Sequence, residues 1–202
     1  MNVNKHNSCS GYFVILVITK NEIMKFTTLA FLSCLYIFCS CNSSNTNSNS
    51  ANNNYPAPDD AAIKKAVDDA YASLSVKGGQ KPHYDSIKDY FIPQAQLINF
   101  IEDTAQILSI DDFVRAFKAY IDSSKIQTFK EQEIYGRTDQ FGNIAQRISS
   151  YKTYINSLDI VKERGVNSFQ LIKTPQGWKV SSIIWDVEKT GKPIPDYYLG
   201  KK

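Results

Sequence analysis

The chain has 202 residues and a small positive charge, with 23 Lys and Arg against 20 Asp and Glu. Three of the lysines and one of the glutamates precede residue 42, so the remainder is almost neutral and offers no basic patch for nucleic acid. Only two histidines are present, and all four cysteines lie within the first 41 residues. These counts exclude disulfides and thiolate metal sites from the rest of the chain, and we expect neither a metal nor a cofactor.

The first 40 residues have the features of a leader that is removed. Lys25 follows Met24 and gives a positive start, and the apolar run over residues 26–39 is too short to span a bilayer, which needs about 20 residues. We therefore predict a signal peptide over 24–40 and an upstream extension of the reading frame over 1–23. The alternative is a membrane helix that begins near Gly11.

Cys41 is the most informative residue of this region. Residues 38–41, Phe-Cys-Ser-Cys, resemble the lipobox of bacterial lipoproteins, in which a small residue precedes the cysteine that receives the lipid. Phe38 departs from the usual aliphatic residue, and an ordinary secretory signal is the alternative. The resemblance implies a lipid anchor at Cys41 in the bacterial cell envelope, with the folded part in the periplasm or on the surface. Asn42 slightly favours the outer membrane.

Residues 41–58 are expected to form a disordered tether. Asn and Ser make up 11 of the 17 residues from 42 to 58, which cannot bury enough apolar surface to offset chain entropy. Residues 59–202 then form one domain. Its size is sufficient for a hydrophobic core of its own.

Hydrophobic periodicity predicts three helices in the first half of this domain. The first begins at Asp59, as the N-cap, and ends before the Gly78-Gly79 pair. The second covers residues 82–91. A strand over 94–100 separates it from the third helix, which is capped by Ser109 or Asp111. Four strands follow, over 128–137, 144–155, 164–174 and 177–188, so the pattern is α+β.

This order resembles the nuclear transport factor 2-like superfamily, also called SnoaL-like. The most specific stretches are Arg-Gly-Val-Asn-Ser-Phe-Gln-Leu at 164–171 and the strand from Trp178 to Trp185. The resemblance implies a cone-shaped curved antiparallel sheet packed on three N-terminal helices, a cystatin-like roll with a pocket beneath it. The superfamily contains dehydratases, isomerases and binding proteins, so the fold leaves the function open.

Three residues are candidate acids or bases. His83 stands beside Asp85, and a histidine near a carboxylate can act as a general base. Glu133 inside an apolar cone would have a raised pKa. In the alternative interpretation, Asp85 caps a helix, His83 faces solvent, and Glu133 is an exposed residue paired with Arg147 or Lys152.

Strand alternation provides candidate pocket residues. One predicted face carries Phe129, Glu131, Glu133 and Tyr135, and the neighbouring one carries Arg147, Ser149, Tyr151 and Thr153. The pocket residues that we expect are Tyr135, Ser149, Tyr151, Asn167, Gln170, Trp185 and Asp186. Most of these have a plain alternative, which is packing in the core or at a dimer interface for the aromatic residues, solvent exposure for Asp186, and edge exposure or backbone bonding for the amides.

We expect the domain to bind a small, partly apolar ligand or a partner protein without chemistry. The alternatives are a dehydratase- or isomerase-type enzyme and a dimeric interaction module. A homodimer is expected in each case because the last strand is apolar on both sides. Trp178, Val180 and Ile184 lie on one predicted face, and Ile183, Trp185 and Val187 lie on the other.

Overall fold

The computed structural model describes residues 59–101 and 103–201 of the chain. The predicted upstream extension, signal peptide, lipidated Cys41 and tether therefore lie outside the described residues. Within the described part, no helix has the length and hydrophobicity that crossing a bilayer requires.

The three predicted helices are present, one of them in a tighter form. They are α1 (Asp60–Ser73), the 3-10 helix η1 (Tyr84–Tyr90) and α2 (Ile110–Ser123), and a second 3-10 helix, η2 (Asp196–Leu199), lies near the C-terminus. Ser109 caps α2, because its hydroxyl accepts a hydrogen bond from the Asp112 amide at 3.1 Å. Asp59 occupies the N-cap position of α1 but makes no side-chain cap, so the prediction of capping there is wrong.

Six strands form one sheet in the order β2-β1-β6-β5-β4-β3. Their bounds are β1 (Phe91–Ile101), β2 (Thr104–Ser109), β3 (Phe129–Phe141), β4 (Ile144–Ile155), β5 (Val161–Thr174) and β6 (Gly177–Val187). All neighbouring pairs are antiparallel except β1 and β6, which run parallel. The short strand β2 was not predicted from the sequence.

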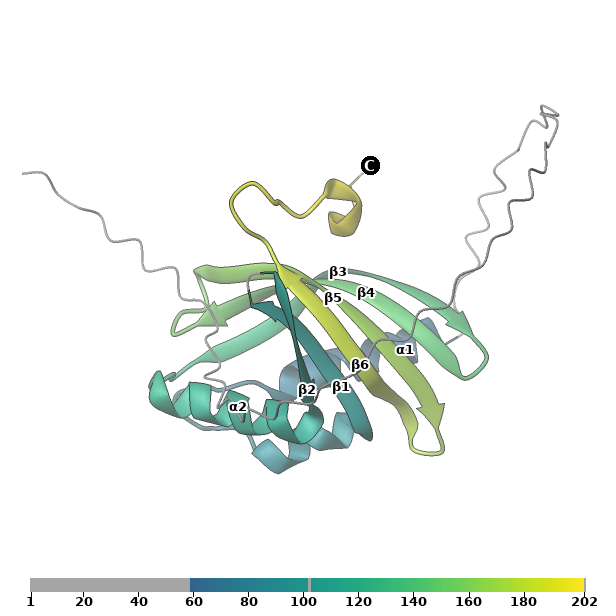
Figure 1. The fold of residues 1–202 in the computed structure, drawn as a ribbon, viewed down its shortest axis with the longest axis horizontal. Coiled ribbons are helices and arrows are strands. Elements are labelled where there is room, and N and C mark those ends of the chain that lie inside the picture. The colour runs from purple at the N-terminus through teal and green to yellow at the C-terminus, as the bar shows by residue number, and fades with distance from the viewer. Residues whose placement is uncertain (1–58, 102, 202) are drawn as a thin grey trace, which may run out of the picture. The chain divides into compact units, whose positions relative to one another are not determined.

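The sheet is strongly curved, and the helices α1, η1 and α2 lie against its concave face (Figure 1). The buried side chains of β4 and β5 alternate along each strand and point to this face, among them Tyr151, Phe169 and Leu171. On the other, convex face the C-terminal segment packs over β3 and β4, where the Ser150 hydroxyl donates to the Tyr198 carbonyl. This arrangement confirms the predicted α+β fold with a curved sheet on helices.

Two irregularities in the strands decide which side chains reach the concave face. In β3 the register shifts between Glu133 and Tyr135, so one extra residue, Ile134, separates them. A similar shift in β6 leaves Ser181 without a paired residue in the ladder, although its hydroxyl donates to the Gln170 carbonyl of β5 at 3.1 Å. A one-residue shift reverses the direction of all side chains beyond it, so periodicity alone misassigns both strands.

The shift in β6 corrects the predicted two-sided apolar strand. Trp178, Val180 and Ile183 are all buried, on both sides of Ser181, whereas Ile184 is 42% exposed on the convex face. Most of the apolar residues of β6 therefore belong to one core. The prediction that Trp178 and Val180 face away from Ile183 is wrong.

Candidate functional site

Two glutamates and two hydroxyl groups form a polar cluster on the concave face. In the strand ladder Thr153 of β4 lies between Glu131 of β3 and Glu163 of β5. The Thr153 hydroxyl donates to Glu131 Oε1 at 3.0 Å, and the Tyr151 hydroxyl donates to Glu163 Oε1 at 3.1 Å. Because the three residues are aligned across adjacent strands, the two carboxyl groups flank one threonine on the same face.

Among the described residues, neither carboxyl group has a positively charged partner. No Lys or Arg in the described part of the chain forms an ion pair with Glu131 or Glu163. Burial, together with the nearby charge of Glu163, raises the pKa of Glu131 to about 7, although the Thr153 bond opposes the shift. Burial also raises the pKa of Glu163, against the hydrogen bond from Tyr151. The pair can therefore hold a proton near neutral pH.

A second hydrogen-bonded group adjoins this cluster. Tyr71 of α1 exchanges a hydrogen bond of 2.9 Å with the Ser149 hydroxyl, and the Asn167 amide donates to the Tyr71 hydroxyl at 2.7 Å. Burial and the charge of Glu131 raise the pKa of Tyr71, so the phenol stays neutral. The predicted pocket residues Ser149, Tyr151 and Asn167 thus come together on the concave face.

Aromatic side chains lie beside the polar cluster. Phe113 and Phe117 of α2 are stacked with ring centroids 6.1 Å apart, and Phe113 meets the edge of Trp185 at 6.4 Å. Phe117 contacts Phe129, two residues before Glu131 in β3, at 5.2 Å. Tyr120 lies on the next turn of α2, and burial, together with the charge of Glu163, raises the pKa of Tyr120. The carboxyl pair therefore borders an apolar wall made largely by one helix.

Beyond Trp185, the concave face contains two buried oxygen atoms without a hydrogen-bond partner. They are Asn99 Oδ1 and Gln106 Oε1, which belong to residues paired across β1 and β2. Asn99 lies beside Trp185 in the ladder, because the preceding residues Ile98 and Ile184 are paired. A buried acceptor without a donor costs about 1–3 kcal/mol. Both of these oxygens are acceptors; the third buried side-chain oxygen without a partner among the described residues, the Tyr84 hydroxyl, lies between η1 and α2.

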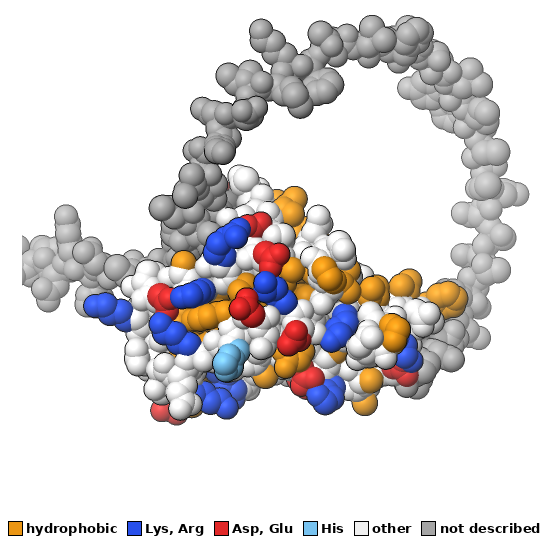
Figure 2. All heavy atoms as spheres, turned by 90° about the horizontal axis from the view of Figure 1, so that it is seen from below, with side chains coloured by type: hydrophobic (Ala, Val, Ile, Leu, Met, Phe, Trp, Pro, Cys, Tyr) orange, Lys and Arg blue, Asp and Glu red, His pale blue; other side chains and the backbone are white. Residues whose placement is uncertain are grey.

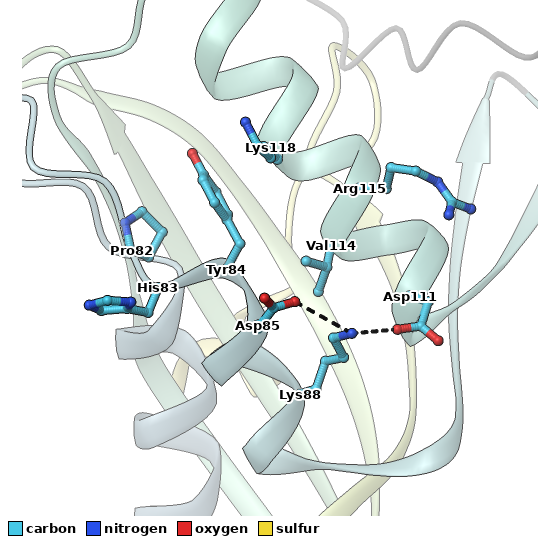
Figure 3. A pocket seen from close by; sticks show the side chains of 9 residues that line it. All are labelled: Pro82, His83, Tyr84, Asp85, Lys88, Asp111, Val114, Arg115 and Lys118. Carbon is cyan, nitrogen blue, oxygen red and sulfur yellow. Dashed lines mark hydrogen bonds and ion pairs between the residues drawn. The ribbon is translucent and has the colours of Figure 1, made fainter.

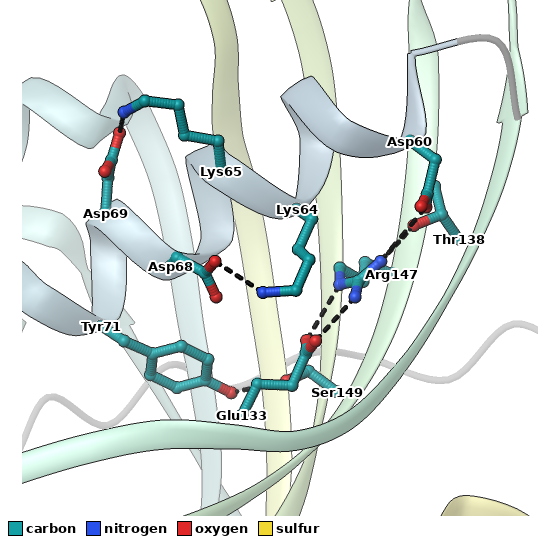
Figure 4. A network of polar contacts seen from close by, with 10 residues as sticks. All are labelled: Asp60, Lys64, Lys65, Asp68, Asp69, Tyr71, Glu133, Thr138, Arg147 and Ser149. Carbon is teal, nitrogen blue, oxygen red and sulfur yellow. Dashed lines mark hydrogen bonds and ion pairs between the residues drawn. The ribbon is translucent and has the colours of Figure 1, made fainter. Parts of the chain in front are cut away.

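Glu133 has a different role from the one that we predicted. Its carboxylate accepts two hydrogen bonds from Arg147, at 2.9 and 2.6 Å, and the Arg147 side chain also contacts Thr138 and Asp60 (Figure 4). The side chains of Arg147 and Glu133 are only 4% and 6% exposed. The predicted pairing with Arg147 is confirmed, but the pair is buried. Breaking such a pair costs about 3–5 kcal/mol, so Glu133 and Arg147 join β3 to β4, and the contact between Arg147 and Asp60 at 3.3 Å links this pair to α1.

His83 and Asp85 lie far from Glu133 in the fold, in a hollow on the outer surface between η1 and α2. The hollow has a volume of about 570 Å³ and is also lined by Lys88, Asp111 and Lys118. Lys88 bridges Asp85 and Asp111, and the His83 ring points away from this ion pair (Figure 3). Acidic and basic side chains are intermingled on this side of the body (Figure 2). The structure therefore does not bring the three predicted acid–base candidates together.

The other predicted pocket residues are divided between the two faces. Trp185 is on the concave face, in contact with Phe113. Tyr135 lies on the convex face beside Gly200, because the extra residue Ile134 reverses its direction, so its predicted shared face with Glu133 is wrong. Gln170 and Asp186 alternate with inward-facing neighbours and also point outward, and the Asp186 carboxylate binds Lys192.

Comparisons with known proteins support the fold. No family model and no curated protein matches the chain. A Nostoc punctiforme protein of unknown function with a cystatin-like fold has a TM-score of 0.52 and 12% identity, covering 65% of this chain and 92% of its own. A putative scytalone dehydratase from Novosphingobium aromaticivorans has a TM-score of 0.51 and 10% identity, covering 65% and 85%. An NTF2-like protein of unknown function from Silicibacter pomeroyi has a TM-score of 0.45 and 13% identity. The match covers 63% of this chain and 94% of that protein.

At these identities the likeness concerns the fold alone. The curved sheet and the concave-side helices of this chain have the cystatin-like architecture of the Nostoc punctiforme protein, as the sequence predicted.

The raised pKa of Glu131 predicts a pH-dependent stability. Glu131 binds its proton more tightly in the folded state, so its favourable contribution is present below pH 4.5 and is lost as the pH rises through about 7. Over this interval we expect the free energy of unfolding of the wild type to fall by roughly 1–3 kcal/mol relative to Glu131→Gln. Denaturant unfolding at several pH values measures the difference. The exposed Asp159→Asn is the control and should follow the wild type. Parallel curves for wild type and Glu131→Gln would contradict the assignment.

Proposed function

We propose that the folded body binds a small, partly apolar molecule that carries a cationic or hydrogen-bond-donating group. The binding site is the concave face where Glu131 and Glu163 border the aromatic side chains of α2. The observation that carries the proposal is the carboxyl pair without a cation, beside aromatic walls. A protonated amine would neutralise the pair, and its apolar part would cover the rings.

The unsatisfied acceptors favour the same type of ligand. Within residues 59–101 and 103–201, no group donates to the side-chain oxygens of Asn99 and Gln106, and the side-chain donors to Glu131 and Glu163 are neutral hydroxyl groups. A ligand that brought further acceptors would leave these groups unpaired and would be disfavoured. The proposed specificity is thus for donors over acceptors.

A series of matched compounds tests this proposal. We expect an aromatic amine to raise the melting temperature of the protein more than the alcohol or carboxylate built on the same ring. Glu163→Gln should weaken amine binding by about tenfold or more, since a charge-assisted hydrogen bond contributes about 1.5–3 kcal/mol, and should change alcohol binding little. Calorimetric titration gives the affinities, with Asp159→Asn as the control. Equal affinities for amine and carboxylate would refute the proposed selectivity.

A second candidate function is proton transfer of the dehydratase or isomerase type. It is favoured by the pKa of about 7 at Glu131, which suits a group that both accepts and donates a proton at neutral pH. The residues would be Glu131, Glu163 and Tyr151 instead of His83, Asp85 and Glu133. Recovery of a bound compound in chemically changed form would favour this candidate over simple binding.

The proposed location of the protein is the bacterial cell envelope, with a lipid at Cys41 and the outer membrane slightly favoured. The lipobox-like residues 38–41 and the preceding apolar run support it. We expect the chain to be found in the membrane fraction of cells and Cys41→Ser to be found in the soluble fraction. Ser43→Ala, two residues further on, should leave the distribution unchanged. Membrane association of Cys41→Ser equal to that of the wild type would refute lipidation at this residue.

The proposed partner besides the membrane is a second copy of the chain. Ile107, Ile98 and Ile184 are neighbours across β2, β1 and β6, and with Phe100 they form an apolar patch on the convex face. Ile107 is 62% exposed, and Phe100 and Ile184 are each 42% exposed. We expect light scattering to give the mass of a dimer and Ile107→Lys to give a monomer. The same mass for both proteins would contradict pairing through this patch.

A further inference from the structure

The hairpin that joins β3 and β4 ends in an exposed apolar tip. Phe141 is 85% exposed and Ile144 is 60% exposed, on either side of the turn at Gly142 and Asn143. No other large hydrophobic side chain in the described part of the chain is as exposed as Phe141. Large apolar groups at a loop tip are unfavourable in water, so a tip of this kind indicates a surface that covers it.

The folded body begins at this same tip. The Asp59 amide donates to Gln140 Oε1 at 2.9 Å, and the Asp59 carboxylate accepts from Lys173 Nζ at 2.6 Å. The Lys173 amide in turn donates to the Asn143 carbonyl at 2.9 Å. Any chain that precedes Asp59 therefore enters the domain beside Phe141.

The tether predicted between the proposed lipid and the domain is short. It consists of the 17 residues of 42–58 between Cys41 and Asp59, and a flexible chain of that length would have a root-mean-square reach of roughly 20–25 Å. A body held by residue 59 at this distance brings the tip within reach of the bilayer surface. The opposite end of the sheet has its own exposed apolar residues, Leu158 and Ile160, but these lie on the connection between β4 and β5 and not at the tether.

We propose that the tip formed by Phe141 and Ile144 inserts into the membrane interface and orients the body on the bilayer. Lipid would cover the exposed side chains of the tip, and the inference rests on the proposed attachment at Cys41. Burying two large apolar side chains stabilises the contact, while the lipid supplies the permanent anchor. The tether then limits distance, and the tip sets the orientation of the domain.

The absence of cysteine after residue 41 allows a direct test. The chain from residue 41 to 202, which retains all the described core residues, can be coupled through its single cysteine to a maleimide lipid in vesicles of phosphatidylethanolamine and phosphatidylglycerol. In this setting Phe141→Trp is compared with Leu158→Trp, both above the common background of Trp178 and Trp185. Lipids brominated on their acyl chains quench a tryptophan that enters the bilayer.

We expect Phe141→Trp to show blue-shifted emission and additional quenching by the brominated lipids, and Leu158→Trp to show neither. Equal quenching of the two variants, or none in either, would overturn the proposal. Because the lipid is supplied chemically, the outcome is independent of whether Cys41 is lipidated in cells.

A second measurement uses the unanchored chain 42–202. We expect the double variant Phe141→Ser, Ile144→Ser to lower partitioning into the same vesicles by about tenfold or more, and Leu158→Ser, Ile160→Ser to change it little. Light scattering of the tip variant should give the same mass as the wild type. A loss of self-association in that variant would identify the tip as a contact between copies and refute the membrane assignment.

Discussion

A buried carboxylate is costly unless a cation or several donors compensate it, and this constraint separates the glutamates of the concave face into two kinds. Glu133 is compensated by Arg147, and the pair is almost fully enclosed between α1 and the sheet. From the described part of the chain, Glu131 and Glu163 each accept one hydrogen bond from a neutral hydroxyl group. The burial of these two carboxyl groups therefore favours either their protonated form or the binding of a cationic ligand. This uncompensated desolvation cost is the physical basis of the proposed ligand site.

The register of β3, β4 and β5 places the two acids close together on the concave face. Glu131, Thr153 and Glu163 are opposite one another in β3, β4 and β5, so the two acids share a neighbour and raise the pKa of Glu131 together with burial. The extra residue Ile134 then ends the inward run of β3 after Glu133 and turns Tyr135 to the convex face. Helix α2 covers the remaining side with Phe113 and Phe117, which keeps the acids partly buried.

Much of this architecture was predictable from the amino-acid pattern. The period of α2, the alternation of β4 and the clustering of Ser149, Tyr151 and Asn167 follow from local sequence, because one face of each element is strongly apolar. The pairing of Glu133 with Arg147 was one of the predicted alternatives, but the burial of this pair and the pairing of Glu131 and Glu163 with hydroxyl groups were not predicted, since both depend on register and curvature. The shifts at Ile134 and Ser181 carry no clear sequence signal, and β2 was missed because its Ile107 faces solvent. Candidates chosen by residue type alone, such as His83, were placed on the outer surface.

A carboxyl-carbon NMR titration of the protein with labelled glutamate shows whether Glu131 and Glu163 form an acid pair that no cation of the described chain neutralises. We expect Glu131 to titrate near pH 7 and its titration midpoint to fall when a protonated amine binds, because the cation stabilises the carboxylate. Titration of Glu131 at the ordinary value of about 4.5, unaffected by amines, would contradict this expectation.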